Sequence, residues 1–322
     1  MPEFRLAPPR LARGAFLAGA TGALAAGVVP GVSRAADPVV LQTGAMPTDA
    51  AAQAFYAQEL GYFKAAGLES KLTVLTNTAS LASAASSGSI EIAYGSVVPL
   101  AEARARGIPF RVIAPATVYS GAATLAMMVG KNSTVQRASD LNGKTIAVNG
   151  LRDLTQYTVQ AWVDKNGGDV KSIKLIEIPF SEMGAALGAG RIDAAIVAEP
   201  FVTAAKGDAR ILGNAAGAVS NHYMITCWFA TEGWLAKNAE VAKRFAAVMM
   251  QTAKWANAHQ KDSAAILTRY TKITPEVAAA ITRATYGETK PDPALVQPVI
   301  DVAVKYGTLA PFSATELIWQ SA

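Results

Sequence analysis

The sequence predicts an α/β protein built from two lobes of similar construction. Short β-type runs alternate with helical runs through residues 39–116, and the alternation starts again at residue 123. The stretch GSIEIAYGSVVP, Gly88 to Pro99, is echoed later by GRIDAAIVAEP, Gly190 to Pro200. Strands that alternate with helices of this length imply parallel βαβ units with helices on both faces of each sheet.

The elements of the first half follow from apolar runs and capping residues. The predicted strands are 39–43, 71–75, 90–94 and 110–116. Gly67 ends the first helix as a C-cap, and Asn77, Thr78 and Ser80 are good N-cap types for the next one. The predicted helices are 50–67, a small-residue helix through Ser86, and 98–106.

The second half repeats this order and explains the echo. The predicted strands are 123–130, 145–148, 173–178 and 193–198, with helices at 153–166 and 181–189. In each half a glycine ends a small-residue helix and an apolar strand follows. Glu91 and Asp193 stand at the starts of the two echoed strands, so we interpret both acids as structural.

The C-terminal part changes character after one more β run at 223–231. The remaining predicted elements are helices at 239–259, 263–270, 275–286 and 293–306. Apolar residues fall on one face of the first of these, which indicates core packing. We expect these helices to pack back on the first lobe, which makes that lobe discontinuous in sequence.

Composition excludes several classes of protein. The chain has 322 residues and a formal net charge of +5, but Arg5, Arg10, Arg13 and Arg34 account for most of the excess. No basic cluster of the kind that binds nucleic acid appears in the rest. Cys227 is the single cysteine, so no intramolecular disulfide is possible. The two histidines have no zinc-site spacing.

The N-terminus resembles an export signal. A basic segment precedes the uncharged run 14–32, and Ser33 to Ala35 provides small residues for cleavage. Five glycines and Pro30 make this run a poor membrane anchor. Gly14 stands where a twin-arginine signal carries its second arginine, so the export route, general secretory or twin-arginine, stays open. We expect a signal peptide over residues 1–35 and a periplasmic location.

In open α/β sheets, ligands bind outside the carboxyl ends of the strands. This rule selects the loops 44–49, 77–80, 95–97, 149–155, 179–181 and 199–201. Arg152 is the only cation in the set, and arginine can hold a carboxylate or sulfonate through two donors. A solvated loop charge, or a partner for Asp153, is an equally good interpretation of Arg152.

Little in the sequence supports a catalytic function. The chain has no Walker-type loop, no G-x-S-x-G and no H-E-x-x-H. His222 and His259 suggest no triad, and Asp153 with Glu199 can form an acid–base pair in principle. A structural or ligand-orienting role suits these acids better, so we expect a protein that is not an enzyme and has no cofactor or metal.

Five ordered motifs resemble one known family. They are ELGYFKAAGLESKL, SSGSIEIAYGS, SDLNGKTIAV, GAGRIDAAIVAEP and EVAKRFAAVMMQTAKWANAH. Their order is similar to that in the nitrate/sulfonate/taurine family of ABC-transporter periplasmic solute-binding proteins, over residues 39–310. The resemblance implies a two-lobe periplasmic-binding-protein fold (type II), in which each lobe is a βαβ-built sheet flanked by helices.

The resemblance also implies how the lobes are joined and what they do. Lobe 1 is expected at 36–118 and 227–322, and lobe 2 at 119–226, with two hinge segments near 116–122 and 220–226. Hinge closure on a solute in the cleft is implied, followed by delivery to a membrane permease. We expect a monomer that binds a small-molecule solute and no nucleic acid.

The expected solute is a small organic anion such as a sulfonate, a carboxylate or a related nitrogen or sulfur compound. Tyr119, Met46 and Trp228 can supply an apolar wall. The predicted ligand-binding residues are Gly44, Met46, Asn77, Thr78, Ser96, Tyr119, Asn149, Arg152, Thr155, Glu199 and Trp228.

Two alternatives remain. One is a thiamine-pyrimidine-type binding protein or enzyme of the same fold, although the Cys-rich segment and the histidine of the enzyme branch are missing. The other is an effector-binding regulator, which needs a helix-turn-helix where this chain carries an export signal.

Overall fold

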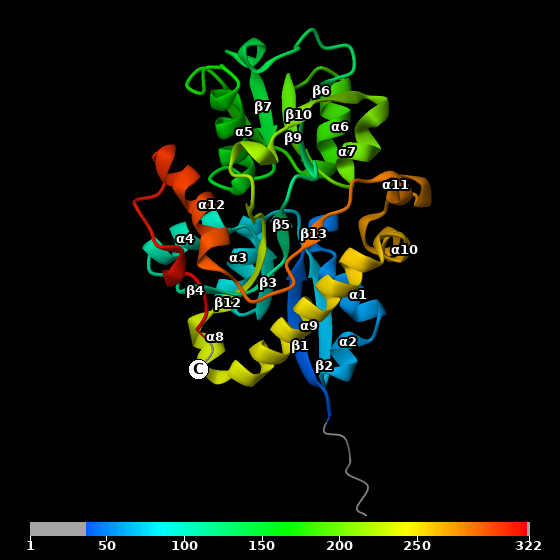
Figure 1. Cartoon of the computed structure of the whole chain (residues 1–322), viewed down its shortest axis with the longest axis vertical. Coiled ribbons are helices and arrows are strands. Elements are labelled where there is room, and N and C mark those ends of the chain that lie inside the picture. The colour runs from blue at the N-terminus through cyan, green and yellow to red at the C-terminus, as the bar shows by residue number, and fades with distance from the viewer. Residues whose placement is uncertain (1–36, 321–322) are drawn as a thin grey trace, which may run out of the picture. The chain divides into compact units, whose positions relative to one another are not determined.

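The computed structural model describes residues 37–320. Two five-stranded sheets with flanking helices form the framework of this part of the chain (Figure 1). The predicted signal peptide, residues 1–35, lies outside the described residues. No helix within the described range is long and apolar enough to cross a membrane. The α/β fold of two sheet-based lobes is therefore confirmed.

The first sheet has the order β2-β1-β3-β12-β4. Its strands are β1 (Val39–Ala45), β2 (Leu68–Val74), β3 (Ile92–Gly95), β4 (Phe110–Pro115) and β12 (Cys227–Thr231). β1 pairs in parallel with β2 and β3, whereas β12 runs antiparallel between β3 and β4. Segments far apart in the chain thus build one sheet.

The second sheet has the order β10-β6-β9-β7-β8, which is the same plan read from the other edge. Its strands are β6 (Leu125–Gly130), β7 (Thr145–Val148), β8 (Lys174–Glu177), β9 (Ala194–Ala198) and β10 (Ala209–Asn214). β7 takes the place of β1, and β6 takes the place of the antiparallel β12. The two similar stretches of sequence therefore provide the central strands, β3 and β9, of two sheets with the same topology. The residue boundaries of the lobes stay a prediction.

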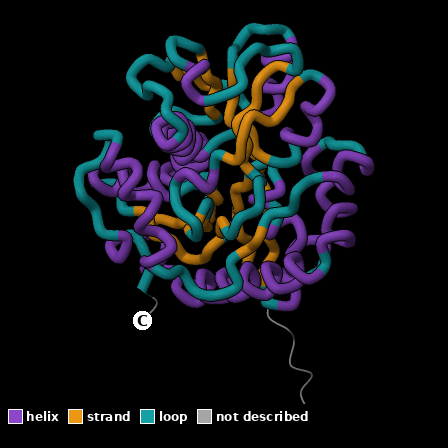
Figure 2. Tube along the Cα trace, turned by 45° about the horizontal axis from the view of Figure 1, so that its top comes forward, coloured by secondary structure: helices purple, strands orange, loops and turns teal. Residues whose placement is uncertain are grey.

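Helices lie outside these sheets (Figure 2). Those of the first sheet are α1 (Gln53–Glu59), α2 (Tyr62–Ala65), α3 (Thr78–Ser87) and α4 (Val97–Ala105), and those of the second are α5 (Leu154–Lys165), α6 (Phe180–Gly188) and α7 (Phe201–Ala204). The single helix predicted at 50–67 is broken, because Gly61 adopts a left-handed φ of 70° between α1 and α2. Short 3₁₀ turns lie at Asp49–Ala51, Ala138–Leu141, Ala205–Gly207, Ala216–Ala218 and Ala314–Glu316.

The C-terminal helices are α8 (Glu232–Lys237), α9 (Ala239–Ala258), α10 (Gln260–Thr271), α11 (Pro275–Ala280) and α12 (Pro293–Lys305). α9 packs on α1 and β4, which are the contacts expected of a helix that returns to the first sheet. α12 contacts both α4 and α5. It therefore lies beside helices of both sheets.

One predicted helix is wrong in its second half. The pattern at 275–286 predicts a single helix, but α11 ends at Ala280, and Thr285–Tyr286 form the strand β13. Tertiary partners override the helical pattern: the Asp49 carboxylate accepts hydrogen bonds from the Ala284 amide (2.7 Å) and from Arg283 Nε (3.1 Å).

A third, three-stranded sheet joins the two large ones. It has the order β11-β5-β13, with β5 at Thr117–Tyr119 and β11 at Tyr223–Met224. These two strands lie in the segments 116–122 and 220–226 that were expected to be hinges, and they pair antiparallel. β13 is a third strand in this sheet that the sequence did not predict.

Candidate functional site

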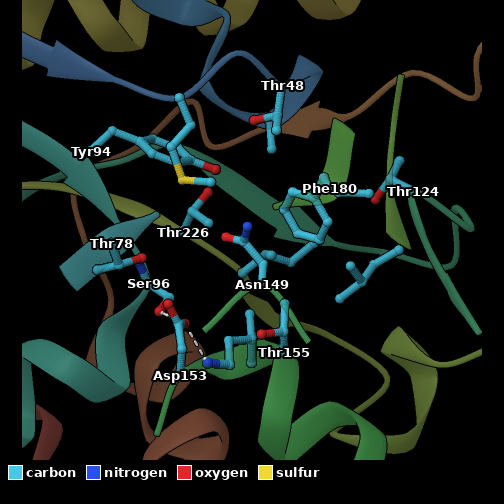
Figure 3. A pocket seen from close by; sticks show the side chains of 16 residues that line it. Thr48, Thr78, Tyr94, Ser96, Thr124, Asn149, Asp153, Thr155, Phe180 and Thr226 are labelled. Carbon is cyan, nitrogen blue, oxygen red and sulfur yellow. Dashed lines mark hydrogen bonds between the residues drawn. The ribbon is translucent and has the colours of Figure 1, made fainter. Parts of the chain in front are cut away.

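A cavity lies between the carboxyl ends of the strands of the two large sheets (Figure 3). Its volume is about 70 Å³, several times the roughly 10–15 Å³ that one water molecule requires on the same measure. A solute of about one small ring therefore fits better than a large one. The cavity is lined by Met46, Thr48, Ala50, Thr78, Tyr94, Ser96, Thr124, Leu125, Asn149, Asp153, Leu154, Thr155, Phe180, Ala198, Ile225 and Thr226.

The first sheet contributes a wall of hydroxyl groups. Thr78 is the first residue of α3 and Ser96 is the N-cap of α4, so both follow strands at their carboxyl ends. The Ser96 amide donates to Thr78 Oγ1 at 3.3 Å. Thr48 Oγ1 is buried and makes no hydrogen bond of ordinary geometry with another described residue. Thr48 thus adds a third hydroxyl to this wall.

The second sheet contributes the loop that follows β7. Asp153 is the N-cap of α5, and its carboxylate accepts a hydrogen bond from the Leu154 amide. The amide side chain of Asn149 donates to the Thr76 carbonyl at 3.2 Å, which ties this loop to the end of β2. The same loop therefore faces the cavity and contacts the opposite sheet.

Asp153 is the one charged side chain among the described residues that line the cavity. It is only 7% exposed, and Ser96 Oγ donates to its Oδ1 across the floor of the cavity (Figure 3). Burial raises the pKa of this carboxyl, while hydrogen bonds from Ser96, the Leu154 amide and Thr78 lower it by less. A buried carboxyl favours a solute that donates hydrogen bonds and disfavours an anion.

Aromatic side chains provide the apolar part of the wall. The ring of Phe180 stacks on Phe201, with centroids 6.5 Å apart and planes 21° apart. Tyr94 packs edge-on against the buried Trp228, with centroids 5.6 Å apart. Burial raises the pKa of Tyr94, although the nearby hydroxyls of Thr226 and Thr48 lower it. Its phenol therefore stays neutral and can donate a hydrogen bond.

The structure brings together part of the predicted site. Met46, Thr78, Ser96, Asn149 and Thr155 line the cavity. Gly44, Asn77, Tyr119, Arg152, Glu199 and Trp228 are not among the lining residues.

Most of the residues that lie elsewhere are used by the fold. Trp228 is fully buried, and its Nε1 donates to Gln53 at 2.9 Å. Tyr119 Oη accepts from Asn214 at 3.0 Å, and Asn77 caps α3. Gly44 lies in β1, where the side chain of Leu81 leaves no room for a larger residue.

The two charged residues of the predicted site point away from the cavity. Arg152 Nε donates to the Glu102 carboxylate at 2.8 Å, so Glu102 is its partner rather than an anion or Asp153. Glu199 is 3% exposed and accepts hydrogen bonds from Thr203 and Thr282. Neither geometry leaves the side chain free for a solute.

Several of the lining residues were not predicted from the sequence. Thr48 and Phe180 lie in loops that the strand-end rule had selected, so only the individual residue was missed. Asp153 lies in such a loop too, and a structural or ligand-orienting role was expected for it. Thr226 follows β11 and Thr124 directly precedes β6, and no ligand-binding pattern in the sequence selects either residue.

Metal chemistry has no visible support within residues 37–320. No group of three or more His, Cys, Asp or Glu side chains there could hold a metal ion. Cys227 is buried, and burial raises the pKa of its thiol, which makes it unreactive.

Comparison with known proteins identifies a family whose model matches this chain. The family model described as "NMT1/THI5 like" matches residues 50–263. The formylaminopyrimidine-binding protein of Halalkalibacterium halodurans is 27% identical over 142 residues, which is 44% of this chain and 42% of that protein. The aligned part thus spans less than half of the relative.

Solved structures confirm the resemblance at the level of the fold. The ligand-binding component of an ABC-type import system from Staphylococcus aureus has a TM-score of 0.76 and 17% identity, over 88% of this chain and 97% of that one. The alkanesulfonate-binding protein SsuA from Xanthomonas axonopodis, bound to MOPS, has a TM-score of 0.73 and 18% identity, over 88% and 99%. The nitrate-binding protein NrtA from Synechocystis has a TM-score of 0.72 and 15% identity, over 87% and 84%.

Proposed function

Because the chain belongs to the NMT1/THI5-like family, we propose that it is the exported solute-binding component of an ABC importer. Its solute is a small nitrogen heterocycle of the aminopyrimidine class, taken up in the cavity between the two sheets. A membrane permease receives the solute, and the predicted signal peptide carries the protein to the periplasm. The protein works as a monomer without a cofactor.

The observation that carries this solute class is Asp153 on the cavity floor. A carboxyl group can accept an N–H from an exocyclic amine and, when protonated, donate to a ring nitrogen. The Phe180 ring offers a face for a flat heterocycle, and aromatic pairs of this kind add stabilisation beyond their buried area. The relative named for formylaminopyrimidine binding supports the same class.

A small organic anion, the solute class favoured by the sequence, has one observation in its favour. The helices α3, α4 and α5 all begin beside the cavity, and free N–H groups at helix N-termini attract anions. The carboxyl of Asp153 already occupies this position as the N-cap of α5. The protein thus supplies its own anion where a sulfonate would otherwise bind, and the aminopyrimidine explains the site better.

Hinge closure is the proposed mechanism. Ser96 and Asp153 meet across the cavity, and Asn149 reaches the Thr76 carbonyl after β2. A solute held between these groups contacts both sheets only when they are close together, so its binding free energy stabilises the closed state.

A thermal-shift panel tests the proposal. The compounds are an aminopyrimidine carrying a hydroxymethyl group, formylaminopyrimidine, an alkanesulfonate and nitrate. A solute at about 100 times its Kd adds roughly 2.7 kcal/mol to the unfolding free energy. We expect the two pyrimidines to raise Tm and the two anions to leave it unchanged. The reverse result would return the assignment to the organic anion, and turnover of a bound pyrimidine would favour the enzyme branch.

A further inference from the structure

The loop that follows β7 meets the opposite side of the molecule at two places. Inside the cavity, Asp153 accepts the hydroxyl of Ser96. Outside it, the neighbouring Arg152 extends to Glu102 on α4, the helix that Ser96 caps. Adjacent residues of one loop therefore hold two positions of one helix, and only the inner pair lines the cavity.

The outer contact is a network rather than a single pair. Glu102 is 4% exposed and accepts Arg152 Nε at 2.8 Å and the Tyr157 hydroxyl at 3.2 Å. Arg152 Nη2 also donates to the Thr308 carbonyl at 3.2 Å. Thr308 Oγ1 donates to Tyr157 Oη at 2.6 Å, which completes the network. Groups from α4 and from the segment after α12 thus face groups from the β7–α5 loop and from α5.

The backbone at Arg152 is shaped for this contact. Arg152 has a φ of 56°, in the left-handed region that residues with a side chain rarely adopt. Its amide donates to Gln156 Oε1 at 2.8 Å, which holds the turn in place. Asp153 then returns to an extended φ of −122° as the N-cap. The turn therefore sends one side chain outward to Glu102 and the next one into the cavity.

We propose that Arg152 and Glu102 form a closure lock, a positioning pair that sets how long a solute stays bound without touching it. The proposal rests on the proposed function in assuming that a solute enters this cavity and that the two sheets move apart to admit it. Opening of the sheets away from each other separates Arg152 from Glu102 and breaks the contacts that Arg152 and Tyr157 make with this carboxylate. The lock therefore adds to the stability of the closed state alone, and its loss lowers the closed fraction and the apparent affinity together.

The chain offers a matched control on the same carboxylate. Arg106 lies one turn along α4, with Nη1 3.8 Å from Glu102 Oε2 and its side chain 62% exposed. Both residues of this pair lie at α4, so closure does not change the distance between them. An Arg106→Met variant removes a cation from Glu102 just as Arg152→Met does, but it leaves the contact between the two sides intact.

The first arm of the test measures dissociation of the hydroxymethyl aminopyrimidine by stopped flow. We expect Arg152→Met and Glu102→Gln each to dissociate roughly three- to fivefold faster, with association changed less than about twofold. Arg106→Met dissociates at the wild-type rate. Because both single variants remove the same contact, the double variant is no faster than the faster single one. Unchanged dissociation in both single variants, or effects that multiply in the double one, would overturn the lock.

The second arm needs no solute, so it decides the inference even if the proposed solute is wrong. Spin labels on Lys71→Cys and Lys174→Cys report the separation of β2 and β8, since both positions are exposed and the native Cys227 is buried. In the unliganded protein, we expect Arg152→Met to shift the distance distribution towards longer values than wild type and Arg106→Met to match wild type. Identical distributions for all three would overturn the lock, whereas failure of the pyrimidine to bind would overturn only the proposed function.

Discussion

The two echoed stretches begin alike. Gly88 and Gly190 have left-handed φ values of 78° and 65° after a small-residue helix. Glu91 exchanges hydrogen bonds with Gln42 on β1, and Asp193 does the same with Thr145 on β7. In each case the acid's backbone amide donates to the partner's carbonyl and its carboxylate accepts the partner's amide. The same pair of hydrogen bonds thus fixes the start of both strands, and the structural interpretation of both acids is confirmed.

The same stretches end differently. β3 runs into Ser96, which lines the cavity and donates to Asp153. β9 runs into Glu199, which turns away and accepts the Thr203 amide at 3.1 Å, the Thr203 hydroxyl at 2.9 Å and the Thr282 amide at 3.1 Å. Thr282 precedes β13 of the three-stranded sheet, so one strand end lies at the cavity and the other is tied to the sheet that joins the two large ones. Residues that build a repeated fold can therefore match while the strand ends diverge in their contacts.

The largest effect that separates the two strand ends is on stability. Glu199→Ala removes the acceptor of three hydrogen bonds from a buried site, and we expect the unfolding free energy to fall by about 3 kcal/mol. Ser96→Ala is the matched variant at the other strand end, and it should change stability by less than about 1 kcal/mol while weakening solute binding. Urea unfolding of both variants measures the difference. Equal losses in the two variants would contradict a structural role for Glu199 that Ser96 does not share.

The next effect concerns the partner of Ser96. Asp153→Asn keeps the size of the side chain but replaces an oxygen acceptor with an NH₂ group facing Ser96 and the solute. We expect the hydroxymethyl aminopyrimidine to bind roughly 100-fold more weakly, a loss of about 2.7 kcal/mol. Isothermal titration calorimetry measures the change, with Asp193→Asn as the control, since Asp193 is not among the residues that line the cavity. Binding within about threefold of wild type would show that Asp153 does not hold the solute.

A smaller effect follows from the raised pKa of Asp153, which lies above the ordinary value of 3.8 because of burial. Between 3.8 and the raised value, the folded chain binds more protons than the unfolded chain. The unfolding free energy contributed by this group therefore falls as pH rises through that window and is constant above it. We expect wild type to lose stability relative to Asp153→Asn as the pH rises above about 4 and to keep a constant difference once the carboxyl is ionised in the folded chain. A difference that is already constant from about pH 4 upwards in urea titrations would contradict the shift.

How much of this was predictable depends on the range of the interactions. Alternating apolar runs identify the strands and helices from local sequence. The ends of parallel strands meet at one edge of a sheet, so Thr78, Ser96 and Asn149 could be expected at the cavity that they line. Arg152 was misplaced because its left-handed turn and its partner Glu102, fifty positions away, leave no local pattern.

Two other errors have the same origin. Trp228 resembles a cavity wall residue in the sequence, but β12 inserts antiparallel beside β3 and buries it against Tyr94 and Phe245. The helix predicted at 275–286 stops early because Asp49 and Glu199, both distant in sequence, take up the amides of Ala284 and Thr282. Contacts between distant segments decide all of these positions, and a single sequence does not display them.

The smallest expected effect lies where the two stretches are alike. Glu91→Gln and Asp193→Asn each exchange a carboxylate for an amide that can still accept the partner strand's N–H, so each should lower the unfolding free energy by about 0.5–1 kcal/mol. Because both acids do the same work on equivalent strands, the two losses should agree within about 0.5 kcal/mol and should add in the double variant. Lys144 Nζ lies 3.4 Å from Asp193, but this exposed pair should contribute little to the second loss. Urea unfolding in high salt, which screens that pair, isolates the backbone contribution. A loss confined to one variant would mean that the strand starts, like the strand ends, have diverged.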